Sequence, residues 1–397
     1  MKKLLALLLA LVMVLGLAAC GDDTTPAPAS AETSGSNETE TTPEAEKPDA
    51  SAETPTTTGE GTDAEIKIGA ILVHDENSGY DAAHIEGLTD ACAALGVSME
   101  NVVFKYNVAE DESCYDAAAD LADAGCDIIF SDSYGHQTYM GQAAADFPDV
   151  VFVACTGDLA AGSGLSNLKN MFPYTYESRY MSGVVAGMKL KEMLDEGVIT
   201  DPYVGYVGAY PYAEVVSGYT AFFLGVQSIV PEAHMDVTYT NSWYDPVAEG
   251  EAANALMGRG CVIIGQHADS TGAPSAVQAA YESGKQVYSI GYNIDMLAVA
   301  PDAALTSAQN VWAVLYQSAL EKFLAGEEIP TDTSFGAANG AVKISALGAS
   351  CAEADPVWVL IMTILILYGL PLQYFLLILI PNMASDPMQV CRLLLYS

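Results

Sequence analysis

The feature that most constrains the fold is the alternation of short apolar runs with alanine-rich stretches between residues 64 and 355. The apolar runs are rich in Val, Ile and Tyr and have the length of buried strands, and the stretches between them have helical spacing. This pattern is typical of βαβ units. We expect strands at 66–72, 102–106, 127–131, 150–154, 203–208, 235–240, 262–265 and 287–291, and helices that include 81–94, 115–124, 177–194, 246–257 and 275–283.

The predicted strands fall into two groups of similar length, which indicates an α/β fold of two doubly wound, Rossmann-like lobes joined by a hinge. We expect residues 64–198 and about 307–350 in lobe 1, and residues 199–306 in lobe 2. Ligands of open parallel sheets bind at the carboxyl ends of the strands. Two such lobes facing each other form a cleft, as in hinged binding proteins that close around a ligand.

Charge and cysteine content exclude several classes of protein. The 397 residues include 51 Asp and Glu against 14 Lys and Arg, a formal net charge of −37. This charge repels phosphate backbones, so nucleic acid is a poor partner. The eight cysteines form no C-x-x-C pair and no histidine stands at metal-ligand spacing, so neither a metal site nor a cofactor is predicted.

The N-terminal region has the features of an export signal. Two lysines precede an apolar run over residues 4–19, and the run ends at Cys20. Residues 17–20 (LAAC) resemble the bacterial lipobox, which implies that residues 1–19 are a signal peptide and that Cys20 is lipidated; a plain secretory signal with an incidental cysteine is the alternative. Residues 20–63 are acidic and rich in Thr, Pro and Ser, which indicates a disordered tether.

The C-terminal region differs abruptly in composition from the rest. Residues 356–397 contain one acidic and one basic residue, and residues 357–380 are almost continuously apolar. This length suits a membrane span, although Pro371 interrupts it. We favour an aberrant gene end, and a real membrane span is the alternative.

Enzyme motifs are absent from the predicted strand-end loops, which contain no G-x-S-x-G, no phosphate-binding P-loop and no G-x-G-x-x-G after a strand. We therefore expect a protein that is not an enzyme. Tyr80 and Trp243 each follow a predicted strand, one in either half of the chain. An aromatic ring on each lip of a cleft can hold a flat ligand between them.

Several motifs, in order along both halves, resemble those of the basic membrane protein (BMP) family. They are residues 77–87 (NSGYDAAHIEG), 133–135 (SYG), 146–152 (DFPDVVF), 176–180 (YESRY) with Gly183 and Gly187, 241–246 (NSWYDP), 266–270 (QHADS) and 305–307 (LTS). Members of this family are substrate-binding lipoproteins of ABC importers with a type I periplasmic-binding-protein fold. The resemblance implies a purine nucleoside or purine base as ligand.

The resemblance also implies site residues. Tyr80 and Trp243 match the two aromatic positions that hold the base in the family, but Asn293 stands where the nucleoside-binding branch has Asp, and Asn310 stands where it has Lys. A branch with Trp at the second aromatic position and the Gln-His-x-Asp-Ser run is more similar to this sequence. That branch implies a free base such as adenine.

Hydrogen-bonding groups near these positions complete the candidate site. Asp269 can accept from an amine or ring N–H of a purine, and Asn310 can both donate and accept. His84 and His267 are either cleft ligands or histidines satisfied under a helix. The candidate ligand-binding residues are Tyr80, Asp81, His84, Tyr134, Trp243, Asp245, His267, Asp269, Asn293 and Asn310.

Together these observations predict a lipid-anchored solute-binding protein on the extracytoplasmic face of the cell membrane. It captures a purine, adenine-like by preference, and delivers it to an ABC permease with its ATPase. Two alternatives remain open: a ligand-sensing receptor of the same fold, and a sugar-binding transport protein.

Overall fold

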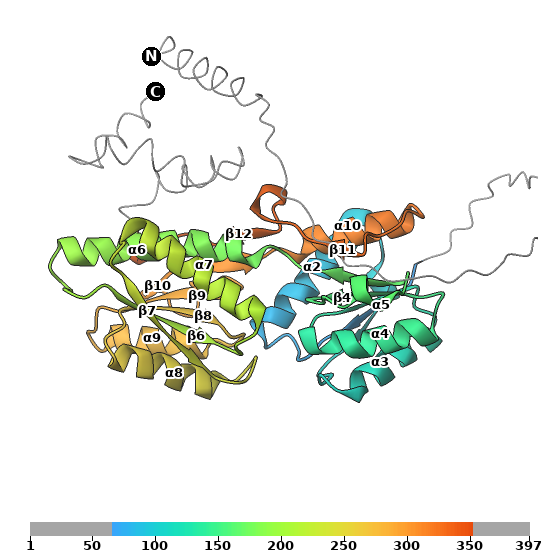
Figure 1. The fold of residues 1–397 in the computed structure, drawn as a ribbon, viewed down its shortest axis with the longest axis horizontal. Helices are drawn as coiled ribbons and strands as arrows, with labels where there is room; N and C mark the ends of the chain where they lie inside the picture. The colour runs from blue at the N-terminus through green and yellow to red at the C-terminus, as the bar shows by residue number, and fades with distance from the viewer. Residues whose placement is uncertain (1–65, 352–397) are drawn as a thin grey trace, which may run out of the picture. The chain divides into compact units, whose positions relative to one another are not determined.

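The computed structural model describes residues 66–351, which form two α/β lobes, each built on a six-stranded sheet (Figure 1). The strands of the first sheet are, in spatial order, β2 (Val102–Lys105), β1 (Ile68–Ile71), β3 (Ile128–Ser131), β4 (Val151–Cys155), β5 (Leu168–Met171) and β11 (Asp332–Thr333). Those of the second are β7 (His234–Tyr239), β6 (Tyr203–Gly208), β8 (Ile263–His267), β9 (Tyr288–Asn293), β10 (Ala304–Asn310) and β12 (Val342–Ile344). The first five strands of each sheet repeat one parallel order, and β12 is antiparallel to β10.

Helices cover both faces of each sheet (Figure 1). Those of the first lobe are α2 (Gly79–Leu95), α3 (Glu112–Asp123), α4 (Gln137–Asp146), α5 (Ala160–Ser163) and α10 (Trp312–Leu324). Those of the second are α6 (Thr175–Asp195), α7 (Ala213–Ile229), α8 (Pro246–Gly258) and α9 (Gly272–Glu282). Short 3₁₀ turns lie at η1 (Met99–Asn101), η2 (Tyr134–His136), η3 (Ala337–Asn339) and η4 (Ala349–Cys351). Because both faces are covered, β1, β3 and β9 are buried at every residue.

Two glycine contacts explain how closely α6 and α7 pack. A Cβ atom at Gly183 would collide with the backbone of Phe222, and one at Gly225 would collide with the backbone of Tyr180. Only glycine allows the two helix backbones to approach this closely. Helix α6, which follows β5 of the first sheet in the chain, is thereby fixed to α7 of the second lobe.

The segments of the chain are divided between the sheets as follows. α6 packs on α7 and β10, and β12 pairs with β10, so residues 175–195 and 342–344 lie with the second sheet rather than within the lobe 1 boundaries expected from sequence. α10 packs on α2 and β11 pairs with β5 in the first lobe. The chain therefore passes between the lobes three times, after β5, after β10 and after β11.

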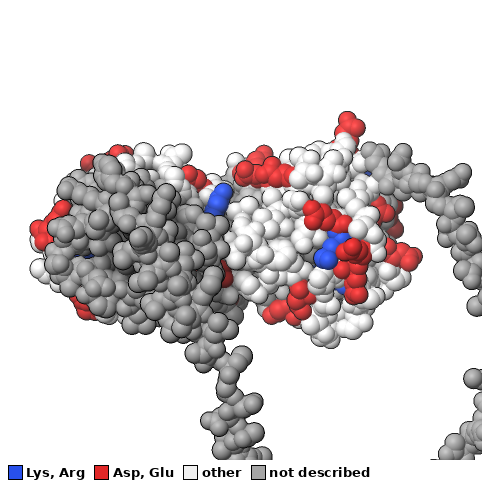
Figure 2. Space-filling model, turned by 90° about the horizontal axis from the view of Figure 1, so that it is seen from above, with Lys and Arg blue, Asp and Glu red and all other residues white. Residues whose placement is uncertain are grey.

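All eight predicted strands and the five named helices are confirmed, with ends shifted by a few residues. Strands β5, β10, β11 and β12 are additional to the predicted set. On the face shown in Figure 2, carboxylates are spread over the visible surface and basic side chains are few. The predicted signal peptide, the tether with Cys20 and the apolar tail lie outside the described residues.

Candidate ligand-binding site between the lobes

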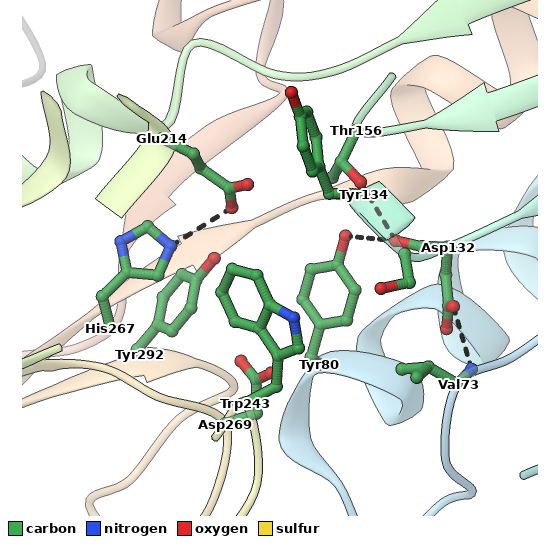
Figure 3. Close-up of a pocket in the computed structure, with 11 residues that line it drawn as sticks. Val73, Tyr80, Asp132, Tyr134, Thr156, Glu214, Trp243, His267, Asp269 and Tyr292 are labelled. Atoms are coloured by element: carbon green, nitrogen blue, oxygen red, sulfur yellow. Dashed lines mark hydrogen bonds and ion pairs between the residues drawn. The ribbon is translucent and has the colours of Figure 1, made fainter. Parts of the chain in front are cut away.

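A small cavity lies where the carboxyl ends of the two sheets face each other (Figure 3). Its lining consists of Val73, Tyr80, Asp132, Ser133, Tyr134 and Thr156 from the first lobe and Glu214, Trp243, His267, Asp269 and Tyr292 from the second. The cavity volume is about 20 Å³, which is room for about one water molecule. A ligand larger than water therefore fits here only if the walls of this cavity move apart.

Aromatic rings from both lobes form the walls of the cavity (Figure 3). Tyr80, near the start of α2, is buried, and its hydroxyl donates to the Asp132 carbonyl at 2.7 Å. Trp243 enters from the second lobe and packs edge-to-face on Tyr210, with 5.2 Å between ring centroids. Its indole Nε1 is buried and has no hydrogen-bond partner among the described residues. The site thus combines two flat apolar faces with an unused donor.

Five of the predicted site residues meet at this cavity: Tyr80, Tyr134, Trp243, His267 and Asp269. Four of them follow a strand or open a helix at the carboxyl edge of a sheet, and His267 is the last residue of β8. Tyr134 is the most exposed of them in the first lobe, and its hydroxyl donates to Asp158 at 3.3 Å.

Two other candidates lie directly behind the lining. Asn293 Nδ2 donates to Asp269 Oδ1 at 3.0 Å, and Asn310 Nδ2 lies 3.4 Å from the Tyr292 hydroxyl. Asn293 adopts a positive φ of 65°, which asparagine tolerates better than most residues. Both asparagines therefore orient residues of the cavity wall.

The remaining candidates have local structural partners. His84 is stacked on Trp312 at 3.8 Å between centroids, and its Nδ1 lies 2.7 Å from the Tyr316 hydroxyl. Burial lowers the pKa of His84 to about 3, so the ring is neutral. Asp245 caps α8 by accepting from the backbone N–H groups of Val247 and Ala248. Neither side chain lines the cavity.

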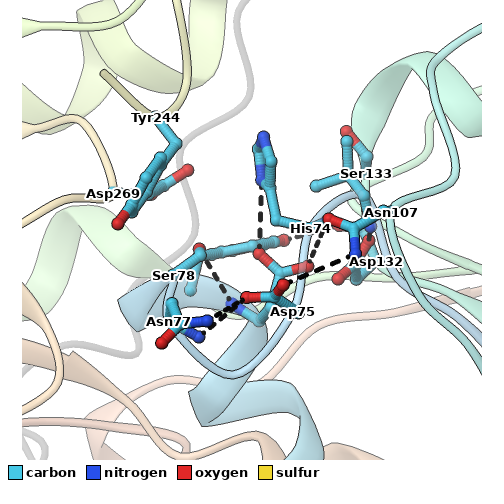
Figure 4. Close-up of polar contacts among 12 residues, drawn as sticks. His74, Asp75, Asn77, Ser78, Asn107, Asp132, Ser133, Tyr244 and Asp269 are labelled. Atoms are coloured by element: carbon cyan, nitrogen blue, oxygen red, sulfur yellow. Dashed lines mark hydrogen bonds and ion pairs between the residues drawn. The ribbon is translucent and has the colours of Figure 1, made fainter. Parts of the chain in front are cut away.

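Two residues of the loop before α2, His74 and Ser78 (Figure 4), hold the remaining candidate, Asp81, in place. Asp81 Oδ1 accepts from the backbone N–H of His74 at 2.8 Å, and Ser78 caps the helix by accepting from the Asp81 N–H. From the second lobe, Tyr244 lies over His74, with 5.6 Å between ring centroids. The Gly79 N–H also donates to the Asp269 carbonyl at 3.1 Å, a direct hydrogen bond between the lobes. Asp81 thus lies just behind the place where the lobes touch.

Buried carboxyl groups dominate the electrostatics of the site. Asp132 Oδ1 accepts from the Val73 N–H at 3.0 Å; burial first and Asp81 next raise the pKa of Asp132 well above its usual range. Burial acts to raise the pKa of Asp81 as well, but hydrogen bonds from His74, Asp132 and Ser78 outweigh it and lower that pKa. The pKa values of these two first-lobe carboxyl groups are therefore shifted in opposite directions.

A buried arginine supports the second-lobe wall. Arg179 of α6 is 1% exposed, and its guanidinium carbon lies 3.5 Å from the centroid of the Tyr292 ring. Its Nη1 donates to the Gln266 carbonyl at 3.1 Å. Burial first and the Arg179 charge next lower the pKa of His267 to about 4. The neutral His267 donates from Nε2 to Glu214, 3.2 Å away.

Six residues of the lining are not among the candidates expected from sequence: Val73, Asp132, Ser133, Thr156, Glu214 and Tyr292. Asp132 and Ser133 follow a predicted strand, so their position at a strand end was the available signal. Thr156 follows β4 with a positive φ of 92°, which a β-branched residue rarely adopts. Tyr292 lies in β9 beyond the predicted strand end, and Glu214 lies in the first turn of α7.

Within residues 66–351, no group of three or more His, Cys, Asp or Glu side chains is placed to hold a metal ion. In the same part of the chain, no helix has both the length and the apolar character needed to cross a bilayer.

Residues 71–357 match the family of PnrA-like ABC transporter substrate-binding proteins (Bmp). The chain belongs to this family. The match confirms the family and the fold expected from sequence, and it makes the chain a binding protein rather than an enzyme. Bmp proteins act outside the cytoplasm, bind a small molecule and serve an ABC permease with its ATPase.

Known proteins similar to this Bmp chain agree on its class. A purine-binding protein of Brucella abortus (strain 2308) is 33% identical over 285 residues, which are 71% of this chain and 75% of that protein. A putative ABC transporter glucose-binding protein of Haloferax volcanii is 36% identical over 205 residues, 52% of this chain and 48% of that protein. A solute-binding protein structure from Conexibacter woesei has a TM-score of 0.56 at 21% identity, over 75% of this chain and 96% of that one, and shows the shared fold.

Proposed function

We propose that this Bmp protein captures a purine base or nucleoside, with an adenine-like base favoured, in the cavity between its lobes. The observation that carries the proposal is the pair of aromatic side chains, Tyr80 and Trp243, that enter the cavity from opposite lobes. When the lobes close on a flat heterocycle, each ring has one of its faces to contact. Such contacts contribute about 1 kcal/mol each beyond the burial of apolar area.

Polar groups around these rings suit the edge of a base. Asp269, Glu214 and the Tyr292 hydroxyl lie in the cavity wall, and the lining contains no Lys or Arg that would pair with a phosphate. This composition favours a base or nucleoside over a nucleotide. The purine-binding relative from Brucella abortus supports the same ligand class.

A sugar is the second candidate ligand. Aromatic faces and carboxylates also hold sugars, and one relative is named as a putative glucose-binding protein. Calorimetry of the purified protein against adenine, hypoxanthine, adenosine, glucose, ribose and galactose decides between the two. We expect a Kd for adenine in the micromolar range or tighter, about −8 kcal/mol. Binding of a sugar without any response to purines would contradict the proposal.

We also propose that acyl chains on Cys20 anchor the protein to the membrane. The support is in the sequence, where two lysines, an apolar run and the residues LAAC precede an acidic tether. Anchoring by acyl chains would hold the binding lobes near the permease that receives the ligand.

A further inference from the structure

Asp269 lies at the contact between the two lobes. It follows β8 in the second lobe, is 5% exposed, and lines the cavity. Its backbone carbonyl accepts from Gly79 of the first lobe at 3.1 Å. Because the cavity is too small for a purine to enter, the lobes must part to load it, and parting them breaks this contact and opens the Asp269 side chain to water.

Carboxyl groups surround Asp269 from several elements. Glu249 of α8 and Glu214 of α7 lie on its own lobe, and Asp81 of α2 faces it across the lobe contact. Burial first, followed by Asp81 and Glu249, raises the pKa of Asp269 well above its usual range. The contribution of Asp81 exists only when the lobes are together.

The basic groups near Asp269 do not offset the effect of these neighbouring carboxyl groups. His267, on the same strand end, is neutral because burial and Arg179 lower its pKa to about 4. Arg179 itself contacts the face of the Tyr292 ring and the Gln266 carbonyl. Tyr292, also facing the cavity, is kept neutral because burial raises its pKa. Closure with an ionised Asp269 would therefore bury a charge without a counter-ion.

The hydrogen bonds of Asp269 indicate where a proton would be held. Oδ1 accepts from Asn293 Nδ2 at 3.0 Å. A proton on Asp269 therefore belongs on Oδ2, the oxygen that Asn293 does not use, and there it makes the side chain a donor toward the cavity.

On the basis of the proposed function, we infer that Asp269 binds the purine as a neutral acid, donating from Oδ2 to a ring nitrogen or carbonyl oxygen, and that capture of the ligand takes up a proton from solvent. The ligand must then present a hydrogen-bond acceptor at this point, and an N–H group there is unfavourable. Asp81 and Asp132 both belong to the first lobe, so a movement between the lobes leaves the two together. Asp269 both lines the cavity and contacts the first lobe through its own backbone carbonyl.

The sign of the pH dependence follows from this arrangement. In the open form Asp269 is solvated and ionised at neutral pH, and in the closed complex it is protonated. Affinity is therefore highest below the pKa of the open form and falls as pH rises, by up to tenfold per pH unit, until the pKa of the closed complex is passed.

Calorimetry of adenine binding in buffers with different ionisation enthalpies tests the inference. At pH 7 the wild-type protein should take up between about half a proton and one proton per adenine. Asp269→Asn should take up none, because its amide keeps an oxygen for Asn293 and places N–H donors toward the ligand. The affinity of this variant should be constant from pH 5 to pH 8 and should exceed that of the wild type at pH 8.

Two further variants complete the experiment. Asp269→Leu has the same branching but bulkier methyl groups and no donor, and should lose binding, whereas Asp195→Asn, at an exposed ion pair with Lys191, should keep the wild-type proton uptake. If the heat of adenine binding to the wild type does not depend on the buffer, the inference about Asp269 is wrong but the proposed function stands. Loss of binding in Asp269→Asn would have the same meaning. Failure of every purine to bind the wild type would overturn the proposed function as well.

Discussion

Trp243 supplies one of the two ring faces of the proposed base site, so its removal is the most direct test at the level of single residues. Trp243→Ala should weaken purine binding by about 1–3 kcal/mol, because it removes a stacking face and its buried apolar area. Trp243→Phe should keep most of the affinity because a flat apolar ring remains. Titration calorimetry of the two variants measures the difference.

Tyr281→Ala is a matched control for Trp243→Ala. Tyr281 packs on Tyr288, with 5.9 Å between ring centroids, and does not line the cavity. Its loss should lower the melting temperature and leave the Kd of folded molecules unchanged. If Trp243→Ala behaves in the same way, Trp243 is a packing residue and the stacking proposal is wrong.

Arg179 acts on the site through Tyr292 and His267, which makes it a positioning residue. Arg179→Met fills a similar volume without the charge and should weaken purine binding about tenfold, since the Tyr292 ring loses its cation. The pKa of His267 should also rise from about 4, because the Arg179 charge no longer opposes protonation. NMR titration of the His267 ring measures the shift.

Arg179→Lys separates charge from shape in the same experiment. The lysine keeps a positive charge but has no planar group to lie on Tyr292. It should hold the pKa of His267 low while restoring only part of the affinity. An unchanged His267 titration in Arg179→Met would show that the arginine serves packing alone.

At the scale of elements, Glu249 joins α8 to the loop after β8. Its Oε1 accepts from the Ser270 N–H at 3.2 Å and from the Asp245 N–H at 3.3 Å, and burial raises its pKa from 4.5 to about 7. A raised pKa means that the native state binds the proton more tightly than the unfolded state. The contribution to stability is complete below pH 4.5 and is lost as pH rises to about 7.

Glu249→Gln should therefore flatten the pH dependence of stability. Between pH 5 and pH 8 the free energy of unfolding of the wild type should fall by up to about 3 kcal/mol more than that of the variant. Urea denaturation at the two pH values measures it. An equal fall in both proteins would mean that Glu249 ionises normally in the native state.

The strands were predictable because helices cover both faces of each sheet, so buried parallel strands are continuous apolar runs. β5 (LKNM) and β10 (ALTSAQN) carry polar residues and lack that signal. The lobe to which α6 belongs was not predictable in this way, because it depends on glycine contacts with α7, a helix that begins 18 residues after α6 ends.

The same limit applies to the candidate site. Tyr80, Trp243 and Asp269 lie in or just after the loops that follow β1, β7 and β8, and topology alone brings these strand ends together. Glu214 reaches the cavity from the first turn of α7. Tyr292 reaches it from β9, which runs beyond the strand end predicted from sequence. His84 and Asn310 are separated from the cavity by side chains in front of them, which is a property of packing and not of sequence position.

At the scale of the whole molecule, the N-terminal cysteine is the proposed point of attachment. Cys20→Ala should release the protein from the membrane fraction while leaving its fold and purine affinity intact, since residue 20 lies far along the sequence from the described lobes. Fractionation followed by immunoblotting checks this. Retention of the variant in membranes would indicate that residues 357–380 form a genuine span.

The three passages between the lobes have a consequence for how the protein is made. Trp312 and Tyr316 of α10 belong to the hydrophobic core of the first lobe, together with Ile68 and Phe130. That core cannot be completed until strands β6 to β10 of the second lobe have been synthesised, because α10 follows β10 in the chain. Such long sequence separations slow folding. A chain destined for export therefore stays unfolded for longer after synthesis begins, which is the state that a translocation channel accepts.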